Sequence, residues 1–162
     1  MRLIVHGQQA FGQAVLERLL SQNEHVVAVY CAPDKGSRPD PLKQAAEQAG
    51  IPVLQPTTYK TPEVAEQMRA LEADLCLMAY VTLIVPSEVL NVPRLGSIQF
   101  HPSLLPDHKG PSSINWPIIQ GKKKTGLSIF WPDDGLDTGP ILLQKSVDIG
   151  PDDTLGLSLI HI

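Results

Sequence analysis

Short apolar runs alternate with segments of helical periodicity along the first hundred residues, and this alternation limits the possible folds more than any other feature. Apolar side chains stand at positions 11, 15, 16, 19 and 20, a spacing that gathers them on one face of a helix. Leu75 to Ala79 is an almost continuous apolar run, which is typical of a parallel strand covered on both faces. Repeated strand–helix units of this length predict an α/β fold with a doubly wound, mostly parallel, Rossmann-like sheet.

Proline and glycine mark several of the expected element boundaries. Pro41 begins a helix that ends at Gly50, and Pro62 occupies the first turn of another helix, with Thr61 before it as the capping residue. We expect strands at residues 3–6, 26–30, 53–54, 75–79, 96–100 and 127–131. We expect helices at residues 11–20, 41–50, 62–72 and 113–120. Ligands of such sheets bind beyond the carboxyl ends of the strands.

Composition narrows the class of protein and of partner. The chain has 162 residues, which favours one soluble domain, and a net charge of −4, which does not favour nucleic acid as a partner. Residues 1–5 run directly into a strand, without a secretory signal or a membrane-spanning run, so we expect a cytoplasmic protein with no membrane partner. Cys31 and Cys76 lie 45 residues apart among apolar neighbours and are interpreted as buried, inert thiols.

The glycine loop after the first expected strand partly matches two nucleotide-binding motifs, but it lacks the residues that contact the phosphates in each of them. Gly7, Gln9 and Gly12 occupy the three positions of the dinucleotide fingerprint, but Gln9 stands where the backbone would approach a pyrophosphate. Gln13 stands where a P-loop would carry its lysine. We therefore expect no nicotinamide cofactor, and we interpret the glycines as permitting a tight turn and close helix packing.

Two titratable residues follow expected strands and form the candidate catalytic pair. His101 opens the run His-Pro-Ser-Leu-Leu-Pro after one strand, and Asp137 lies between Gly135 and Gly139 in a turn after another. An imidazole can give a proton to a leaving nitrogen, while a carboxylate can orient the imidazole or take a proton from water. The pair therefore suits acyl-type transfer or hydrolysis. The alternative is that His101 is an ordinary turn residue.

Nearly the whole chain, residues 1 to about 155, resembles the folate-dependent formyltransferases, and in particular the N-terminal hydrolase domain of 10-formyltetrahydrofolate dehydrogenase. The segments that carry this resemblance include the glycine loop, the His-Pro-Ser-Leu-Leu-Pro run and the Asp-Asp-Gly-Leu-Asp-Thr-Gly run. The matching segments are residues 4–8, 11–13, 33–35, 40–42, 96–98, 101–106, 113–116, 129–131, 133–139, 142–145 and 151–154.

The resemblance implies a substrate and a place for it. The substrate would be 10-formyltetrahydrofolate, the formyl donor, with its pterin against the backbone of Leu83, Ile84 and Val85. The formyl carbon would lie between His101, which stabilises developing charge and supplies a proton, and Asp137, which activates the nucleophile. Such a reaction requires no metal. The alternative for residues 83–85 is that their side chains are simply core.

Gln99 is where this sequence departs from both branches of the family. Formyltransferases of this fold usually carry Asn two residues before the histidine, and the hydrolase domain carries an apolar residue there. The side chain of Gln is longer than that of Asn but keeps an amide that can donate a hydrogen bond. This residue is therefore compatible with both formyl transfer and hydrolysis. The leading hypothesis is hydrolysis of 10-formyltetrahydrofolate to tetrahydrofolate and formate. The alternatives are formyl transfer to an amine on an aminoacyl-tRNA, a ribonucleotide or a sugar nucleotide, and folate binding without turnover.

The end of the chain stops resembling the family. Family members continue into another helix and then a smaller, barrel-like C-terminal domain. We expect residues 1–156 to form a formyltransferase-type N-terminal domain that is incomplete at its C-terminus, and residues 157–162 to be an atypical end. The C-terminal partner domain would then be missing from this chain.

Overall fold

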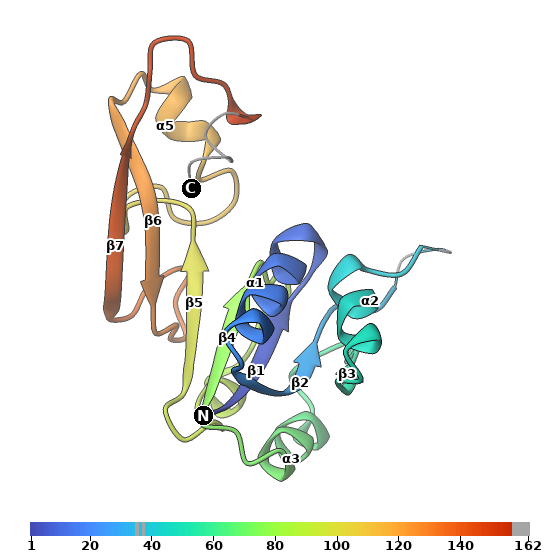
Figure 1. Ribbon diagram of the computed structural model, residues 1–162. Coiled ribbons are helices and arrows are strands. Elements are labelled where there is room, and N and C mark those ends of the chain that lie inside the picture. The colour runs from blue at the N-terminus through green and yellow to red at the C-terminus, as the bar shows by residue number, and fades with distance from the viewer. Residues whose placement is uncertain (35, 37, 157–162) are drawn as a thin grey trace. The chain divides into compact units, whose positions relative to one another are not determined.

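The computed structural model describes residues 1–34, 36 and 38–156 (Figure 1). The chain forms two compact units, Met1–Ile98 and Gln99–Ile162. The atypical end that we expect at residues 157–162 lies outside the described residues. No helix in the described part of the chain is both long and apolar enough to cross a membrane.

The first unit contains a parallel sheet with helices between its strands, as the sequence predicts. Strand β1 pairs in parallel with both β2 and β4, and β2 pairs in parallel with β3. Its strands are β1 (Arg2–Gly7), β2 (His25–Tyr30), β3 (Val53–Leu54) and β4 (Leu75–Ala79). Its helices are α1 (Gln9–Ser21), α2 (Pro41–Gln48), α3 (Pro62–Ala70) and α4 (Ser87–Leu90). Helix α4, which is only four residues long, is not among the predicted helices.

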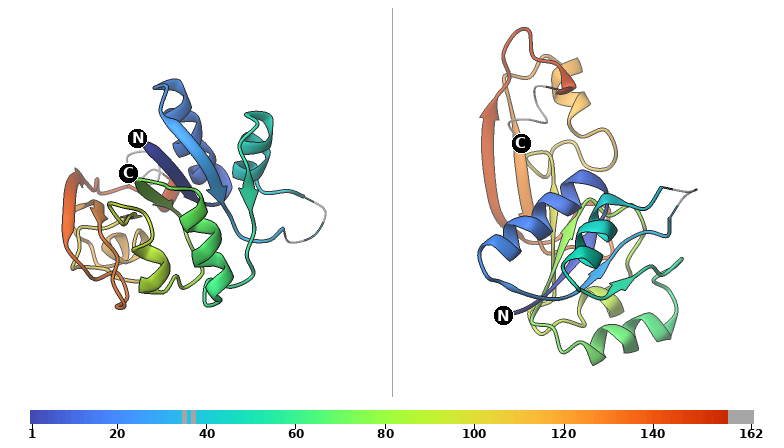
Figure 2. Two further views of the ribbon diagram at one scale, coloured as in Figure 1. Left: turned by 90° about the horizontal axis from the view of Figure 1, so that it is seen from below. Right: turned by 45° about the vertical axis from the view of Figure 1, so that its right-hand side comes forward.

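Both faces of this sheet are covered, because successive side chains of a strand point to opposite faces. Leu3 and Val5 of β1 lie in one buried cluster with Leu16 of α1 and Leu42 of α2. Ile4 lies in the other cluster, with buried residues of α3 and α4. The views in Figure 2 show α1 and α2 on one side of these strands and α3 on the other. The doubly wound arrangement is therefore confirmed for this unit.

The glycine loop serves packing at two of its positions. A Cβ atom on Gly7 would lie 2.2 Å from the carbonyl oxygen of Ala79, and one on Gly12 would lie 2.9 Å from the Leu42 side chain. Both residues are therefore small because another part of the fold comes close. Asp40 caps α2 by accepting from the Leu42 N–H at 2.9 Å and also accepts from the Gln9 N–H that begins α1. By contrast, Thr61 occupies the capping position of α3 without making a side-chain cap bond.

The second unit is antiparallel. Strand β5 runs from the first unit into the second, β6 pairs antiparallel with it, and β7 pairs antiparallel with β6. Its elements are β5 (Ser97–His101), α5 (Asn115–Ile119), β6 (Lys124–Phe130) and β7 (Ile141–Asp148). The hydrogen-bonded strand order is β3-β2-β1-β4-β5-β6-β7. The mostly parallel, formyltransferase-like sheet is confirmed, with these antiparallel strands at its end.

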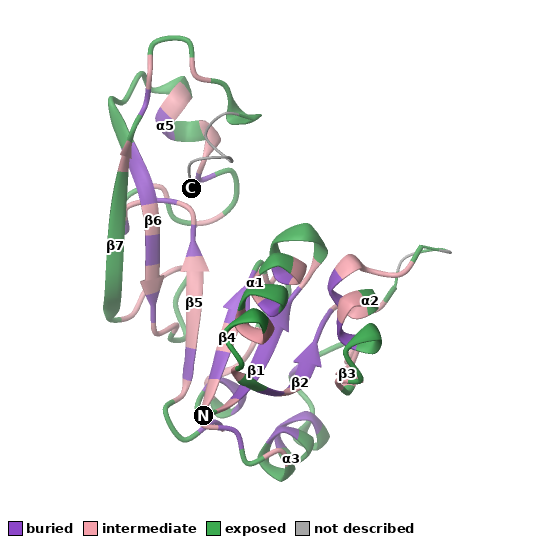
Figure 3. Cartoon of the chain, viewed as in Figure 1, coloured by how far each residue is buried: buried purple, intermediate pink, exposed green. Residues whose placement is uncertain are grey.

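Strand β7 is not among the strands predicted from the sequence. Seven of its eight residues are exposed, and Figure 3 shows it green along nearly its whole length. It is the last strand in the order and has a hydrogen-bonded partner on only one side. An exposed edge strand has no buried face, so its sequence needs no alternation of apolar and polar residues.

Candidate active site

The two predicted catalytic residues lie together in the second unit. His101 is the last residue of β5, and Asp137 lies in the loop between β6 and β7. Nδ1 of His101 is 3.4 Å from Oδ2 of Asp137, and the side chains are only 7% and 8% exposed. The structure therefore makes a buried acid–base pair from residues 36 positions apart in the sequence. One detail differs from expectation, because His101 ends the strand and does not lie in the loop after it.

The other ring nitrogen of His101 also has a partner. Nε2 lies 2.9 Å from the backbone carbonyl oxygen of His108. A carbonyl oxygen only accepts hydrogen bonds, so this contact requires the hydrogen on Nε2. When the ring is protonated, the hydrogen on Nδ1 faces the carboxylate of Asp137. The doubly protonated ring thus has an acceptor for each of its hydrogens.

The turn that carries Asp137 is tight, and a hydrogen bond from a residue outside the turn holds the Asp137 carboxylate. Asp137 has a φ of 48° and Gly139 a φ of 104°, both in the left-handed region. A Cβ atom on Gly139 would lie 2.0 Å from the carbonyl oxygen of Trp131, so only glycine fits. The Asp137 carboxylate accepts from the Gly110 N–H at 2.7 Å. These contacts direct the carboxylate toward His101.

Neither neighbouring aspartate is paired with His101. The Asp133 carboxylate accepts hydrogen bonds from the Thr138 hydroxyl and from the Gly135 N–H at 2.9 Å. Those bonds, that of Thr138 first, lower the pKa of Asp133 below its usual value. Asp134 is exposed. We interpret Asp133 as a residue that stabilises the turn through these hydrogen bonds.

A network that sequence reasoning missed holds the proline loop after His101 against the sheet. The Ser128 hydroxyl donates to the carbonyl of Ser103 at 2.7 Å and accepts from the N–H of Leu105 at 3.0 Å. The Gln144 amide donates to that hydroxyl and to the carbonyl of Leu105, at 2.8 Å each. Ser128 is opposite His101 in the register of β5 and β6, so its hydroxyl lies on the same face of the sheet. Ser128 could have been identified as part of this network only from its pairing with His101 across the two strands.

Gln99 lies two residues before His101 on β5, opposite Phe130 of β6, and is half-buried. Because alternate residues of a strand share a face, its side chain emerges on the same face as the imidazole. Its role as an oxyanion donor stays a prediction.

The residues predicted to hold the pterin lie in the first unit, in the segment between β4 and α4. Ile84 is 79% exposed and Leu83 is 37% exposed, while Val85 packs against a buried cluster. The alternative that these side chains are all core is wrong for Ile84 and Leu83. Folate contact by this segment stays a prediction.

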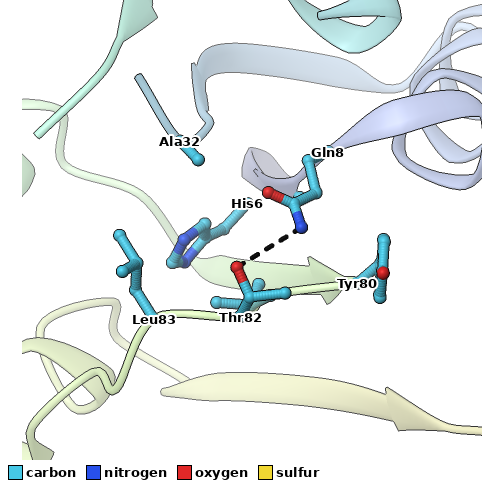
Figure 4. A pocket seen from close by; sticks show the side chains of 8 residues that line it. His6, Gln8, Ala32, Tyr80, Thr82 and Leu83 are labelled. Atoms are coloured by element: carbon cyan, nitrogen blue, oxygen red, sulfur yellow. Dashed lines mark hydrogen bonds between the residues drawn. The ribbon is translucent and has the colours of Figure 1, made fainter. Parts of the chain in front are cut away.

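A recess at the carboxyl edge of β1 and β4 adjoins this segment (Figure 4). The strand order reverses direction beside β1, which is where ligands of open α/β sheets bind. The Gln8 amide lies 3.4 Å from the Thr82 hydroxyl across the recess. None of the residues that line it is acidic or basic except for a buried histidine, His6. Its lining consists of His6, Gly7, Gln8, Ala32, Tyr80, Val81, Thr82 and Leu83.

Sequence reasoning assigned no role to His6. In the structure it is buried beside two aromatic rings. Its ring centroid is 4.8 Å from that of Tyr59 and 6.1 Å from that of Tyr30. Burial lowers the pKa of His6 to about 3, because the charged ring would lose its hydration. At neutral pH the recess therefore offers only uncharged hydrogen-bonding groups.

The buried His6 predicts a loss of stability in acid. Between a pKa of about 6.5 in the unfolded chain and about 3 in the folded one, only the unfolded chain binds the proton, so stability falls as pH falls through this window. At about 1.4 kcal/mol per pH unit, the free energy of unfolding should drop by about 3 kcal/mol between pH 7 and pH 4 from this group alone. Urea unfolding of the parent and of His6→Phe at both pH values measures the difference.

His25, an exposed histidine at the start of β2, provides the control. His25→Gln should lose as much stability in acid as the parent, whereas His6→Phe should lose less. Equal acid losses in the parent and His6→Phe would show that His6 does not resist protonation.

Comparison with known proteins shows the family to which this chain belongs. Residues 1–157 match the family described as formyl transferase. The chain belongs to this family. It is 46% identical over 160 residues to mitochondrial 10-formyltetrahydrofolate dehydrogenase of Mus musculus and 47% identical to the cytosolic form, covering 96% of this chain in each case. It is 41% identical to methionyl-tRNA formyltransferase of Trichlorobacter lovleyi, over 95% of this chain and 51% of that protein.

Solved structures show the same fold. Phosphoribosylglycinamide formyltransferase from Bacillus halodurans has a TM-score of 0.85 at 24% identity, covering 100% of this chain and 87% of that one. A formyltetrahydrofolate deformylase from Pseudomonas syringae has a TM-score of 0.81 at 20% identity, covering 98% and 54%. This formyl transferase domain spans only 17% to 18% of the two dehydrogenases. The resemblance read from the sequence is confirmed, and the named relatives are enzymes of formyl-group chemistry.

Proposed function

We propose that this formyl transferase domain hydrolyses 10-formyltetrahydrofolate to tetrahydrofolate and formate, with His101 and Asp137 as the catalytic pair. The observation that supports this most is the buried contact of 3.4 Å between the two side chains. A buried imidazole at the end of a strand and a buried carboxylate in a tight loop beside it are suited to moving protons where water is largely excluded. Relatives named as dehydrogenases and as a deformylase of formyltetrahydrofolate support the choice of substrate.

The proposed reaction follows from the pair. Water attacks the formyl carbon while Asp137 takes a proton from it, and the carbonyl oxygen becomes an oxyanion. The bond from carbon to N10 of the folate then breaks, and the protonated His101 gives its proton to that nitrogen. The products are formate and tetrahydrofolate. These steps transfer no hydride and call on no metal, so neither a nicotinamide cofactor nor a metal enters the proposal.

We place the pterin against the backbone of residues 83–85 in the first unit. The side chains of Leu83 and Ile84 are exposed and apolar, as the walls of a slot for a flat ring would be before ligand binds. Backbone N–H and C=O groups of an irregular segment can match the donors and acceptors along the edge of a pterin. Folate is then the small-molecule partner of this domain.

Formyl transfer is the second candidate. The amide of Gln99 favours it, because it keeps the donor that transferases of this fold carry as Asn, and one relative is named a methionyl-tRNA formyltransferase. A tRNA acceptor calls for a basic surface, which a net charge of −4 does not favour. A domain that binds folate without turnover is the third candidate.

Release of formate from 10-formyltetrahydrofolate, with and without added amines, separates the three candidates. Formate released without any amine supports hydrolysis. Loss of the formyl group only when glycinamide ribonucleotide, methionyl-tRNA or a sugar nucleotide amine is present supports transfer. Tight folate binding without loss of the formyl group supports the binding module.

Gln99 gives a prediction that tests its contribution to either reaction. If its amide donates to the developing oxyanion, Gln99→Leu should cost about 2 to 4 kcal/mol in transition-state stabilisation. Gln99→Asn keeps an amide and should retain activity, with a gain in transfer to an added amine. Single-turnover rates of formyl loss measure both. If Gln99→Leu releases formate as fast as the parent, the amide is a bystander and transfer loses its main support in this sequence.

Three further expectations stay predictions: a reaction without a metal, a cytoplasmic location and a missing C-terminal partner domain. Among the residues that the structure describes, no three His, Cys, Asp or Glu side chains gather as a metal site would require. That finding does not test whether the reaction needs a metal. The relatives are named as cytosolic and as mitochondrial forms, so the cytoplasmic location is untested, and so is the C-terminal partner domain.

A further inference from the structure

The turn at residues 107–110 contacts both members of the catalytic pair through its backbone. The carbonyl oxygen of His108 lies 2.9 Å from Nε2 of His101, and the N–H of Gly110 donates to Oδ2 of Asp137 at 2.7 Å. The same carboxylate oxygen lies 3.4 Å from Nδ1 of His101. One short turn therefore supplies an acceptor to the imidazole and a donor to the carboxylate.

The backbone conformation of this turn allows both contacts. His108 has a φ of 53° and Gly110 a φ of 76°, so alternate residues adopt the left-handed conformation. That conformation is costly for a residue with a Cβ atom, except that Asn, Asp and His adopt it more readily than others. The start of the turn is anchored, because the Ser103 hydroxyl donates to the carbonyl of Asp107 at 2.7 Å. A strained residue in an anchored turn beside a catalytic pair is a sign of functional positioning.

We propose that residues 107–110 are a positioning element for the reaction, in which the His108 carbonyl holds the hydrogen of His101 on Nε2 and Gly110 fixes the Asp137 carboxylate. When the ring is doubly protonated, Nδ1–H faces the Asp137 carboxylate and Nε2 is the nitrogen that gives its proton to the folate nitrogen. In the transfer, the Nε2–H bond of the imidazolium breaks and the N10–H bond forms, while the neutral ring keeps its hydrogen on Nδ1 and the His108 carbonyl loses its hydrogen-bond donor until the ring is protonated again. This inference rests on the proposed function for its chemistry, but the position of the hydrogen can be measured without any turnover.

Two substitutions at position 108 separate the backbone from the side chain. His108→Asn keeps a residue that tolerates positive φ, whereas His108→Val introduces a β-branched residue that strongly disfavours it. The Val variant should lower kcat about 10- to 100-fold with little change in KM, because a misplaced catalytic group slows chemistry more than binding. The Asn variant should stay within a few-fold of the parent. Asn23→Val, at a φ of 59° in the first unit, is the matched control for backbone strain.

The ring ¹⁵N chemical shifts of His101 report which ring nitrogen carries hydrogen. If residues 107–110 only stabilised the fold, substitutions at position 108 would not change these shifts. The parent, His108→Asn and Asn23→Val should show hydrogen on Nε2, and His108→Val should lose this preference. A parent spectrum with hydrogen on Nδ1 and a bare Nε2 overturns the proposal, even if His108→Val fails to fold. In a domain that is active, loss of activity in both position 108 variants, or in neither, also overturns it. If the domain neither hydrolyses nor transfers but the ring spectra respond as expected, the proposed function fails and the positioning role stands.

Discussion

Replacement of His101 by alanine should lower the rate of formate release by roughly 10² to 10⁴, while folate binding stays largely intact. The imidazole is buried, lies 3.4 Å from the Asp137 carboxylate and, in the proposed reaction, carries the proton that the leaving nitrogen needs. Its loss would leave a poor leaving group and a developing charge without a nearby cation. Steady-state formate release and the equilibrium binding of a non-hydrolysable folate measure the two effects.

His25→Ala is the control for this experiment, since His25 is an exposed histidine of the first unit. It should release formate like the parent. Near-normal turnover in His101→Ala would remove the imidazole from the mechanism, and a loss of folate binding equal to the loss of rate would assign it to binding instead.

Asp137→Asn should fold normally and lose about as much activity as His101→Ala. Asn tolerates the φ of 48° at this position almost as well as any residue other than Gly, so the turn is preserved. The variant removes the charge that faces Nδ1 and the base that takes a proton from water. Because the pair works as a unit, the double variant His101→Ala/Asp137→Asn should be little slower than either single one.

The neighbouring aspartate Asp134 is the matched control, because it is exposed in the same loop. Asp134→Asn should keep the parent rate. Full activity in Asp137→Asn would mean that the carboxylate is structural and serves only to accept the Gly110 N–H. Inactivation by Asp134→Asn instead would assign the base to that residue.

Most of the first unit could be predicted because its signals are local. Pro41 and Pro62 begin helices where a proline costs least, and the apolar run of β4 is covered on both faces. Strand β7 gave no such signal, since an edge strand in solvent has no face to bury. The hydroxyl of Thr61 shows the limit even of a good local signal, because a capping residue does not have to make its cap bond.

His101 and Asp137 could be chosen from the sequence because each stands in a motif beside an expected strand, but only the tertiary structure brought their side chains within 3.4 Å. Ser128 and Gln144 hold the loop after His101, and the His108 carbonyl contacts the His101 ring, through strand register and turn conformation, which no local pattern encodes. Composition and periodicity thus determine which segments become strands and helices, since those depend on neighbours in sequence. The hydrogen-bond partners of a side chain, and the hydration that it loses on burial, depend on residues far away in the sequence. Only the folded structure therefore determined these partners and this burial.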